Sequence, residues 1–298
     1  MANLKEVGTE LRDAGAQAVQ GATQSVQESV EQGVRHAAPG LEALARFGYA
    51  SKGVVYGTIG LLALNLALGR SGQVTDSQGA LTRIHDLPLG GLLIWLLVVG
   101  LLGYALWQLL RALLDPEEQG NGPKGLLKRA GYAVSGLTNF GVAYFAYRLA
   151  TQAAVTAGGS TQKDLAWQVL DWPGGQVLLG LAGLVMLVVG GVQVANAVSG
   201  KFMKRIALHD FAARHAETVR RVGQAGIAAR GVVLGAVGVF LLLAAWKGSA
   251  SGVRDTAGIL NWLHDQGSAL LAVVALGTLC YGAWCFVQAL YRRIRIGD

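Results

Sequence analysis

The chain has 298 residues, of which 52% are apolar and 14% charged, and its mean hydropathy is +0.42. A typical soluble domain carries about 25% charged residues, so this composition favours an all-α integral membrane protein over a soluble one. The formal net charge is +7, but no basic stretch is interleaved with aromatic residues and no nucleic-acid motif occurs, so we expect no nucleic-acid partner.

Residues 1–40 form a separate polar region that precedes the apolar part of the chain. Apolar residues recur there at helical spacing, which predicts an amphipathic helix that ends at Ala38-Pro39-Gly40. Acids outnumber bases in this region, so it lacks a basic face for anionic lipid. Three interpretations stay open: a marginal helix, a helix lying on the membrane, or a helix that binds a partner. No cleavable signal peptide is expected, so the first apolar span would act as its own insertion signal.

Six apolar spans follow, each long enough to cross a hydrocarbon layer about 30 Å thick. They cover residues 46–69, 88–114, 130–152, 174–199, 226–246 and 267–290. The loops after the second and fourth spans and the C-terminal tail carry twelve Lys and Arg residues, whereas the other three loops carry five. The positive-inside rule therefore predicts a multi-pass protein with both termini in the cytoplasm.

The odd-numbered spans open with related sequences, at residues 46–53, 129–136 and 224–231. The even spans match as well, since Tyr104 aligns with Tyr281. We therefore expect three tandem two-helix repeats after the N-terminal segment, at residues 41–123, 124–217 and 218–298. Each unit crosses the membrane twice, so all three have the same orientation, and parallel repeats predict a pseudo-threefold bundle around an axis along the membrane normal.

A short amphipathic stretch separates the two helices of each repeat. Its apolar residues are Ala80, Leu81 and Ile84; Leu165 and Val169; and Ile259, Leu260 and Leu263. We interpret it as an interfacial helix on the outer surface, with Trp167, Trp172 and Trp262 at headgroup depth. His85-Asp86 and His264-Asp265 precede even spans; each Asp is expected to cap the following helix, and a paired metal or pH-sensing site is the alternative.

These features resemble the bacterial membrane family known as domain of unknown function 1206. The matching elements are the Arg-x-Gly-Tyr-x-x-x-Gly openings, the Asp76-x-x-Gly79-Ala80-Leu81 stretch and Pro88-x-Gly90 before the second span. The third repeat departs from the pattern, with Gln and Ile in place of Arg and Tyr. The resemblance covers about residues 41–295. It implies three two-helix repeats in a bacterial cytoplasmic (inner) membrane, and no activity.

The glycines of the odd spans recur at helical spacing. Gly53, Gly57 and Gly60 share one face, and Gly231, Gly235 and Gly238 repeat that spacing. Small residues let helix backbones approach closely in lipid, which predicts tight helix packing. A glycine-lined pathway is the alternative.

The charges within the spans are the strongest candidates for a site. Lys52 and Arg230 occupy equivalent repeat positions, where repeat two has Ser135. If the odd helices line the pseudo-threefold axis, these three residues form a ring near the cytoplasmic side, with Tyr56 and Asn139 one turn deeper. Such a ring would attract an anion or a lipid phosphate. The alternative is that the two cations extend to cytoplasmic headgroups.

All 18 acids lie outside the six spans, which weighs against a carboxylate proton relay and an acidic cation filter. No catalytic, metal-binding or cofactor motif occurs, so we expect a protein that is not an enzyme and has no cofactor. The first hypothesis is a non-enzymatic scaffold or accessory subunit. Its partners would be membrane lipids, with another membrane protein or a partner of the N-terminal segment. The alternative is a small anion or amphiphile transporter or pore whose basic site lies on the odd-numbered helices.

Overall fold

The computed structural model describes residues 39–115, 120, 122–151 and 161–292. Residues 44–293 form one compact unit. Residues 1–38, which contain nearly all of the expected amphipathic N-terminal segment, lie outside the described residues.

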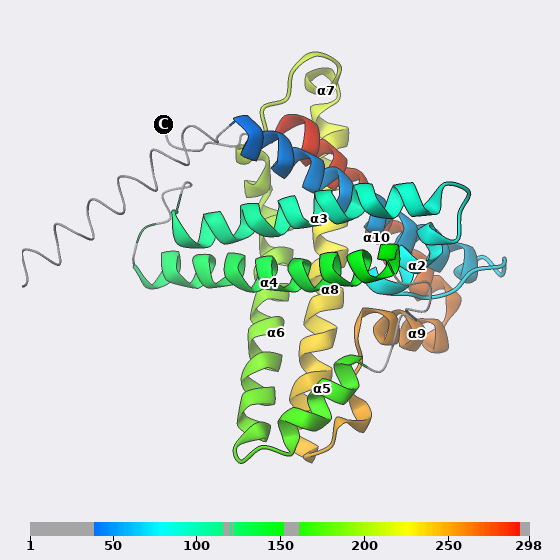
Figure 1. Ribbon diagram of the computed structural model, residues 1–298, viewed down its shortest axis with the longest axis vertical. Coiled ribbons are helices and arrows are strands. Elements are labelled where there is room, and N and C mark those ends of the chain that lie inside the picture. The colour runs from blue at the N-terminus through cyan, green and yellow to red at the C-terminus, as the bar shows by residue number, and fades with distance from the viewer. Residues whose placement is uncertain (1–38, 116–119, 121, 152–160, 293–298) are drawn as a thin grey trace, which may run out of the picture. The chain divides into compact units, whose positions relative to one another are not determined.

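Each repeat consists of a long helix, a short helix and a second long helix (Figure 1). In repeat one these are the Pro39–Ala67 helix, α2 (Ser77–His85) and α3 (Gly90–Leu113). Repeat two has α4 (Pro123–Thr151), α5 (Thr161–Leu170) and α6 (Gly175–Ser199). Repeat three has α8 (Ala216–Lys247), α9 (Thr256–Gln266) and α10 (Ser268–Tyr291). The short elements η1 (Lys201–Arg205) and α7 (Asp210–Arg214) join repeats two and three, and η2 (Ala250–Gly252) precedes α9.

Five of the described helices are long and apolar enough to cross a membrane: the Pro39–Ala67 helix, α3, α6, α8 and α10. This identifies a membrane protein. The sixth expected span is α4, which has 29 residues but does not reach the hydropathy of the other five. Its interior carries Ser135, Thr138 and Asn139, and these polar side chains explain the difference.

Backbone contact through glycine holds α6 against α8, which run side by side in Figure 1. A Cβ on Gly190 would lie 2.6 Å from the Gly231 oxygen, and a Cβ on Gly238 would lie 2.7 Å from the Gly183 oxygen. Only glycine allows this approach. The predicted close packing is therefore confirmed for Gly231 and Gly238, whereas a Cβ on Gly235 would meet only the Leu187 side chain at 3.9 Å. The partner of the odd helix is the even helix of the preceding repeat.

The same relation recurs at the other junctions between repeats. α3 packs against α4, and the Pro39–Ala67 helix packs against α10, where a Cβ on Gly60 would lie 2.8 Å from the Leu279 nitrogen. Within repeats one and three the two long helices also pack together, but α4 and α6 do not pack along each other. The closed pseudo-threefold bundle therefore stays a prediction.

The short helices bury one side against the long helices. α2 buries Ala80, Leu81 and Ile84, and α9 buries Ile259 and Leu260. Leu81 and Leu260 belong to the same core as Val55 and Ile59 of the Pro39–Ala67 helix. The expected amphipathic character is confirmed for α2 and α9, and the position of these helices at the outer headgroups stays a prediction.

A left-handed turn leads into α3 and into α6. Leu89 has φ +64° and Gly174 has φ +83°, and each immediately precedes the first residue of an even helix. This conformation suits Gly174, whereas Leu89 carries a Cβ that clashes with its own backbone there.

Candidate functional site

Two cationic side chains from different repeats lie close to one set of tyrosines. Lys52 comes from the Pro39–Ala67 helix and is 3% exposed, and Arg230 comes from α8 and is half-buried. The Lys52 Nζ lies 4.0 Å from the centre of the Tyr104 ring on α3. The Arg230 Cζ lies 5.0 Å from the Tyr281 ring on α10. Repeats one and three therefore each place a cation over the equivalent tyrosine.

Tyr56 connects the two halves of this arrangement. The Lys52 Nζ and the Arg230 Cζ each lie 5.8 Å from the centre of its ring. The rings of Tyr56 and Tyr281 meet edge to face, with centroids 4.7 Å apart. A cation over an aromatic face gains about 0.5–2 kcal/mol, more when it is desolvated, so the tyrosines stabilise both charges in part.

Hydrogen bonding leaves Arg230 incompletely satisfied. Its Nη1 donates to Oε1 of Gln193 on α6 at 3.2 Å, but its Nε is buried without a hydrogen-bond partner. Among the described residues, no carboxylate forms an ion pair with Arg230 or with Lys52. Within the part of the chain that the structure describes, the site thus has two positive charges and no paired carboxylate to balance them.

A cavity of about 40 Å³ adjoins Arg230. It is lined by Tyr56, Ile59, Arg230, Val233, Leu234, Thr256, Leu260, Thr278 and Tyr281. Four helices contribute to this wall: the Pro39–Ala67 helix, α8, α9 and α10. Lys52 does not line the cavity, but it contacts Tyr56, which does.

Of the five residues predicted for the site, the structure brings together Lys52, Tyr56 and Arg230. Ser135 and Asn139 lie on α4, where the Asn139 Nδ2 donates to the Ser135 carbonyl at 2.7 Å. Their described contact is thus within α4, and none joins them to either cation.

The sequence reading did not assign Tyr104, Tyr281 or Gln193 to the site. The two tyrosines occupy equivalent positions in repeats one and three, and that equivalence was the available signal. Gln193 carries no such signal, because its contact with Arg230 joins α6 to α8 across 37 residues of sequence.

The arginine that opens the first two repeats binds the end of a neighbouring helix. Arg129 donates from Nε to the Ala112 carbonyl at 2.8 Å and from Nη2 to the Leu113 carbonyl at 2.9 Å, at the end of α3. Arg46 likewise donates to carbonyls at the end of α10, including that of Leu290 at 2.8 Å. The last carbonyls of a helix lack partners within it, so Arg129 links repeat two to repeat one, and Arg46 links repeat one to repeat three.

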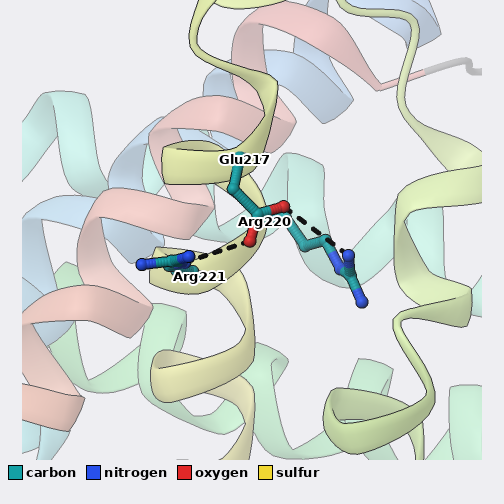
Figure 2. Close-up of polar contacts among 3 residues, drawn as sticks. All are labelled: Glu217, Arg220 and Arg221. Carbon is teal, nitrogen blue, oxygen red and sulfur yellow. Dashed lines mark hydrogen bonds and ion pairs between the residues drawn. The ribbon is translucent and has the colours of Figure 1, made fainter.

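Exposed charges at the start of α8 pair with one another (Figure 2). The Glu217 carboxylate lies 3.0 Å from the Arg221 Nε and 3.5 Å from the Arg220 Nη1. All three side chains are exposed, so each pair contributes little to stability.

Aspartates cap the short helices at their N-termini. The Asp76 carboxylate accepts from the backbone N–H groups of Gln78 and Gly79, and the Asp255 carboxylate accepts from that of Gly258. The Asp-x-x-Gly stretch is therefore an N-cap, in which the Asp carboxylate accepts a hydrogen bond from the backbone N–H of the glycine. Burial raises the pKa of the Asp255 carboxyl, the bond from Gly258 opposes that shift, and the nearby Asp76 charge adds to it.

The expectation that Asp86 and Asp265 cap the even helices is wrong. Asp86 lies at the C-terminal end of α2, and Asp265 lies in the last turn of α9. The residues before α3 and α10 make no side-chain capping bond, because Leu89 and Gly267 have no side-chain acceptor. Within the described residues, no group of three or more His, Cys, Asp or Glu side chains is placed to hold a metal ion.

Comparison with known proteins finds a repeated family match. The family described as Domain of Unknown Function (DUF1206) matches three times, at residues 47–115, 130–200 and 225–292. The chain is also 31% identical over 258 residues to "Uncharacterized protein YxxB" of Bacillus subtilis (strain 168), covering 86% of this chain and 93% of that protein. No solved structure matches the chain. The three tandem matches agree with the resemblance seen in the repeat sequences, and the chain belongs to the DUF1206 family.

Proposed function

We propose that this protein binds an anionic group within the membrane, beside Arg230 and Lys52, and acts as a carrier or pore for it without being an enzyme. The observation that supports this most strongly is the Arg230 guanidinium, which lines a cavity with a buried, unpartnered Nε and with no carboxylate to pair with among the described residues.

The energy balance favours an anion as the missing partner. A cation at the centre of a membrane helix costs about 2.5–3.5 kcal/mol on insertion scales, and cation–π contact returns about 0.5–2 kcal/mol. Lys52 and Arg230 both lie 5.8 Å from one tyrosine ring, so they also repel each other. An anion between two repeats would lower this cost for both cations.

The test is anion-dependent stability of the full-length protein in detergent. Chloride, nitrate and phosphate are titrated at constant ionic strength against gluconate, and the melting temperature is recorded for wild type, Lys52→Gln and Arg230→Gln. Arg254→Gln is the matched control, because Arg254 also lies over an aromatic ring, 5.1 Å from that of Phe240, but outside the cavity.

We expect at least one anion to raise the melting temperature of wild type and Arg254→Gln, and to bind Arg230→Gln about tenfold or more weakly. The same result with phosphatidylglycerol nanodiscs in place of free anions would also support the proposal, with a lipid phosphate as the ligand. Equal responses of all four proteins to every anion and lipid would contradict it.

The proposal includes six spans with both termini in the cytoplasm of a bacterial inner membrane, arranged around a pseudo-threefold axis. α4 supports the sixth span by its length, since 29 residues of helix extend about 43 Å. Alkaline phosphatase and green fluorescent protein fusions after α3, α5 and α10 test this topology. Phosphatase activity only after α5 supports six spans, whereas activity at the C-terminus means that α4 does not cross.

A scaffold or accessory subunit is the second candidate, favoured by the backbone contact between Gly190 of α6 and Gly231 of α8. Such packing builds a rigid bundle, which suits a protein that holds membrane lipids, another membrane protein or a partner of its N-terminal segment. Purification in native nanodiscs tests this function. A stoichiometric partner would support it, and anion flux by the isolated protein in liposomes would contradict it.

A further inference from the structure

We infer that the anion is a small, free, monovalent ion of about three non-hydrogen atoms, held between the Pro39–Ala67 helix, α8, α9 and α10, and not the phosphate of a lipid. This inference rests on the proposed function and specifies the ligand of that same site.

The volume of the cavity limits the size of the anion. Its volume of about 40 Å³ accommodates about three water-sized groups, since one water needs roughly 10–15 Å³ on this measure. Chloride and formate fit within that limit, and nitrate, with four non-hydrogen atoms, lies close to it. A lipid phosphate has four oxygens and two ester arms, and it would need room for glycerol as well.

The hydrogen-bond donors around the cavity determine what kind of group can bind there. Arg230 supplies a buried Nε that has no protein partner, and Tyr56 and Tyr281 each carry a hydroxyl. The Thr278 hydroxyl donates to the Val274 carbonyl at 2.8 Å within α10, so its proton is already engaged. The Arg230 Nε is therefore a buried donor that lacks an acceptor, and a compact anion in the cavity would supply one.

The charge of the residues that line the cavity limits the charge of the anion. Arg230 is the cation among the lining residues, and Ile59, Val233, Leu234 and Leu260 are apolar. Thr256 brings the N-terminus of α9 to the cavity, but the Asp255 carboxylate caps that helix end and offsets its positive dipole. One net positive charge at the wall favours a monovalent anion over a divalent one.

The experiment varies the cavity by one or two carbon atoms at Val233, which is 7% exposed and lines the cavity. Val233→Leu fills part of the empty space and Val233→Ala enlarges it. Because Val233→Leu adds a single carbon next to existing room, the variant is expected to fold. The probes are chloride, nitrate, sulfate and isobutyrate as sodium salts, and nanodiscs with or without phosphatidylglycerol, with melting temperature as the readout.

Wild type is expected to respond to chloride or nitrate and not to sulfate or isobutyrate. Val233→Leu should bind the small anions about tenfold more weakly, and Val233→Ala should gain a response to isobutyrate. Val233→Ala with an unchanged size preference would overturn the inference.

The inference and the proposed function fail in different ways. A response that depends on Arg230 but arises only from phosphatidylglycerol would overturn the inference while the proposed function stands. A response that is the same in Arg230→Gln, for small anions and for lipid, would overturn both.

Discussion

Two adjacent glycines of α6 offer a matched test of how the repeats are joined. Gly190 is buried against α8, where an added Cβ would lie 2.6 Å from the Gly231 oxygen and 2.7 Å from the Gly235 nitrogen. Gly191 is exposed and has no atom within 4 Å of such a Cβ. Alanine at either position therefore changes the intrinsic helix propensity by the same amount. Only alanine at position 190 disturbs the packing of α6 against α8.

The magnitudes follow from these distances. Replacing glycine by alanine inside a helix gains about 1 kcal/mol in intrinsic propensity. At Gly191 that gain should appear in full, so Gly191→Ala is predicted to stabilise the protein by about 1 kcal/mol. At Gly190 the two backbones must move apart, and overpacking of this kind costs about 1–3 kcal/mol. Gly190→Ala should therefore be less stable than Gly191→Ala by about that amount.

The assay is reversible unfolding in mixed micelles, in which increasing dodecyl sulfate unfolds the protein and tryptophan fluorescence reports the transition. Both variants gain the same helix propensity, so the difference between their stabilities reports the packing of α6 against α8. Equal stability of Gly190→Ala and Gly191→Ala would refute the close packing of α6 on α8.

Three further predictions concern other elements. Arg129→Ala should destabilise the protein by about 1.5–3 kcal/mol in the same assay, because the Ala112 and Leu113 carbonyls lose a charged donor; an unchanged midpoint would contradict the link between repeats. Leu89→Gly should stabilise by about 1 kcal/mol, because φ +64° is unfavourable for leucine and its side chain is 78% exposed; a loss of stability would show that the side chain makes an essential contact. Asp255→Asn should remove the part of the pH dependence of folding stability that comes from this carboxyl. Burial raises the pKa of this carboxyl in the folded state, so its stabilising contribution is complete below the unfolded pKa and is lost as pH rises through the folded one. Asn retains the cap without the charge, so Asp255→Ala should be less stable than Asp255→Asn by about 1 kcal/mol at every pH; identical pH profiles for wild type and Asp255→Asn would contradict this.

Much of the architecture follows from sequence periodicity. Long apolar runs predict membrane helices because a bilayer needs them, and five of the described helices meet that requirement. The repeated openings predicted three copies, which the family match confirms. α4 shows the limit of this reasoning: its three polar residues reduce its hydropathy, and whether it crosses a membrane depends on neighbours that the sequence pattern does not show.

The candidate site was predictable in part. Lys52 and Arg230 stood out because charges within apolar spans are rare and costly. Their contacts with Tyr104, Tyr281 and Gln193 were not predictable, since these join different helices and depend on how the repeats pack. The expected role of Ser135 assumed a closed ring, whereas its described hydrogen bond is to a residue of its own helix.

Anomalous X-ray scattering from crystals grown in bromide is a direct test of anion binding beside Arg230. Bromide replaces chloride with little change in size and marks its own position. The account predicts an anomalous peak in the cavity lined by Tyr56, Arg230 and Tyr281, and no peak there in Arg230→Gln. A wild-type cavity that holds only water at high bromide concentration, with Arg230 directed at a lipid headgroup or a carboxylate, would contradict the small free anion inferred here.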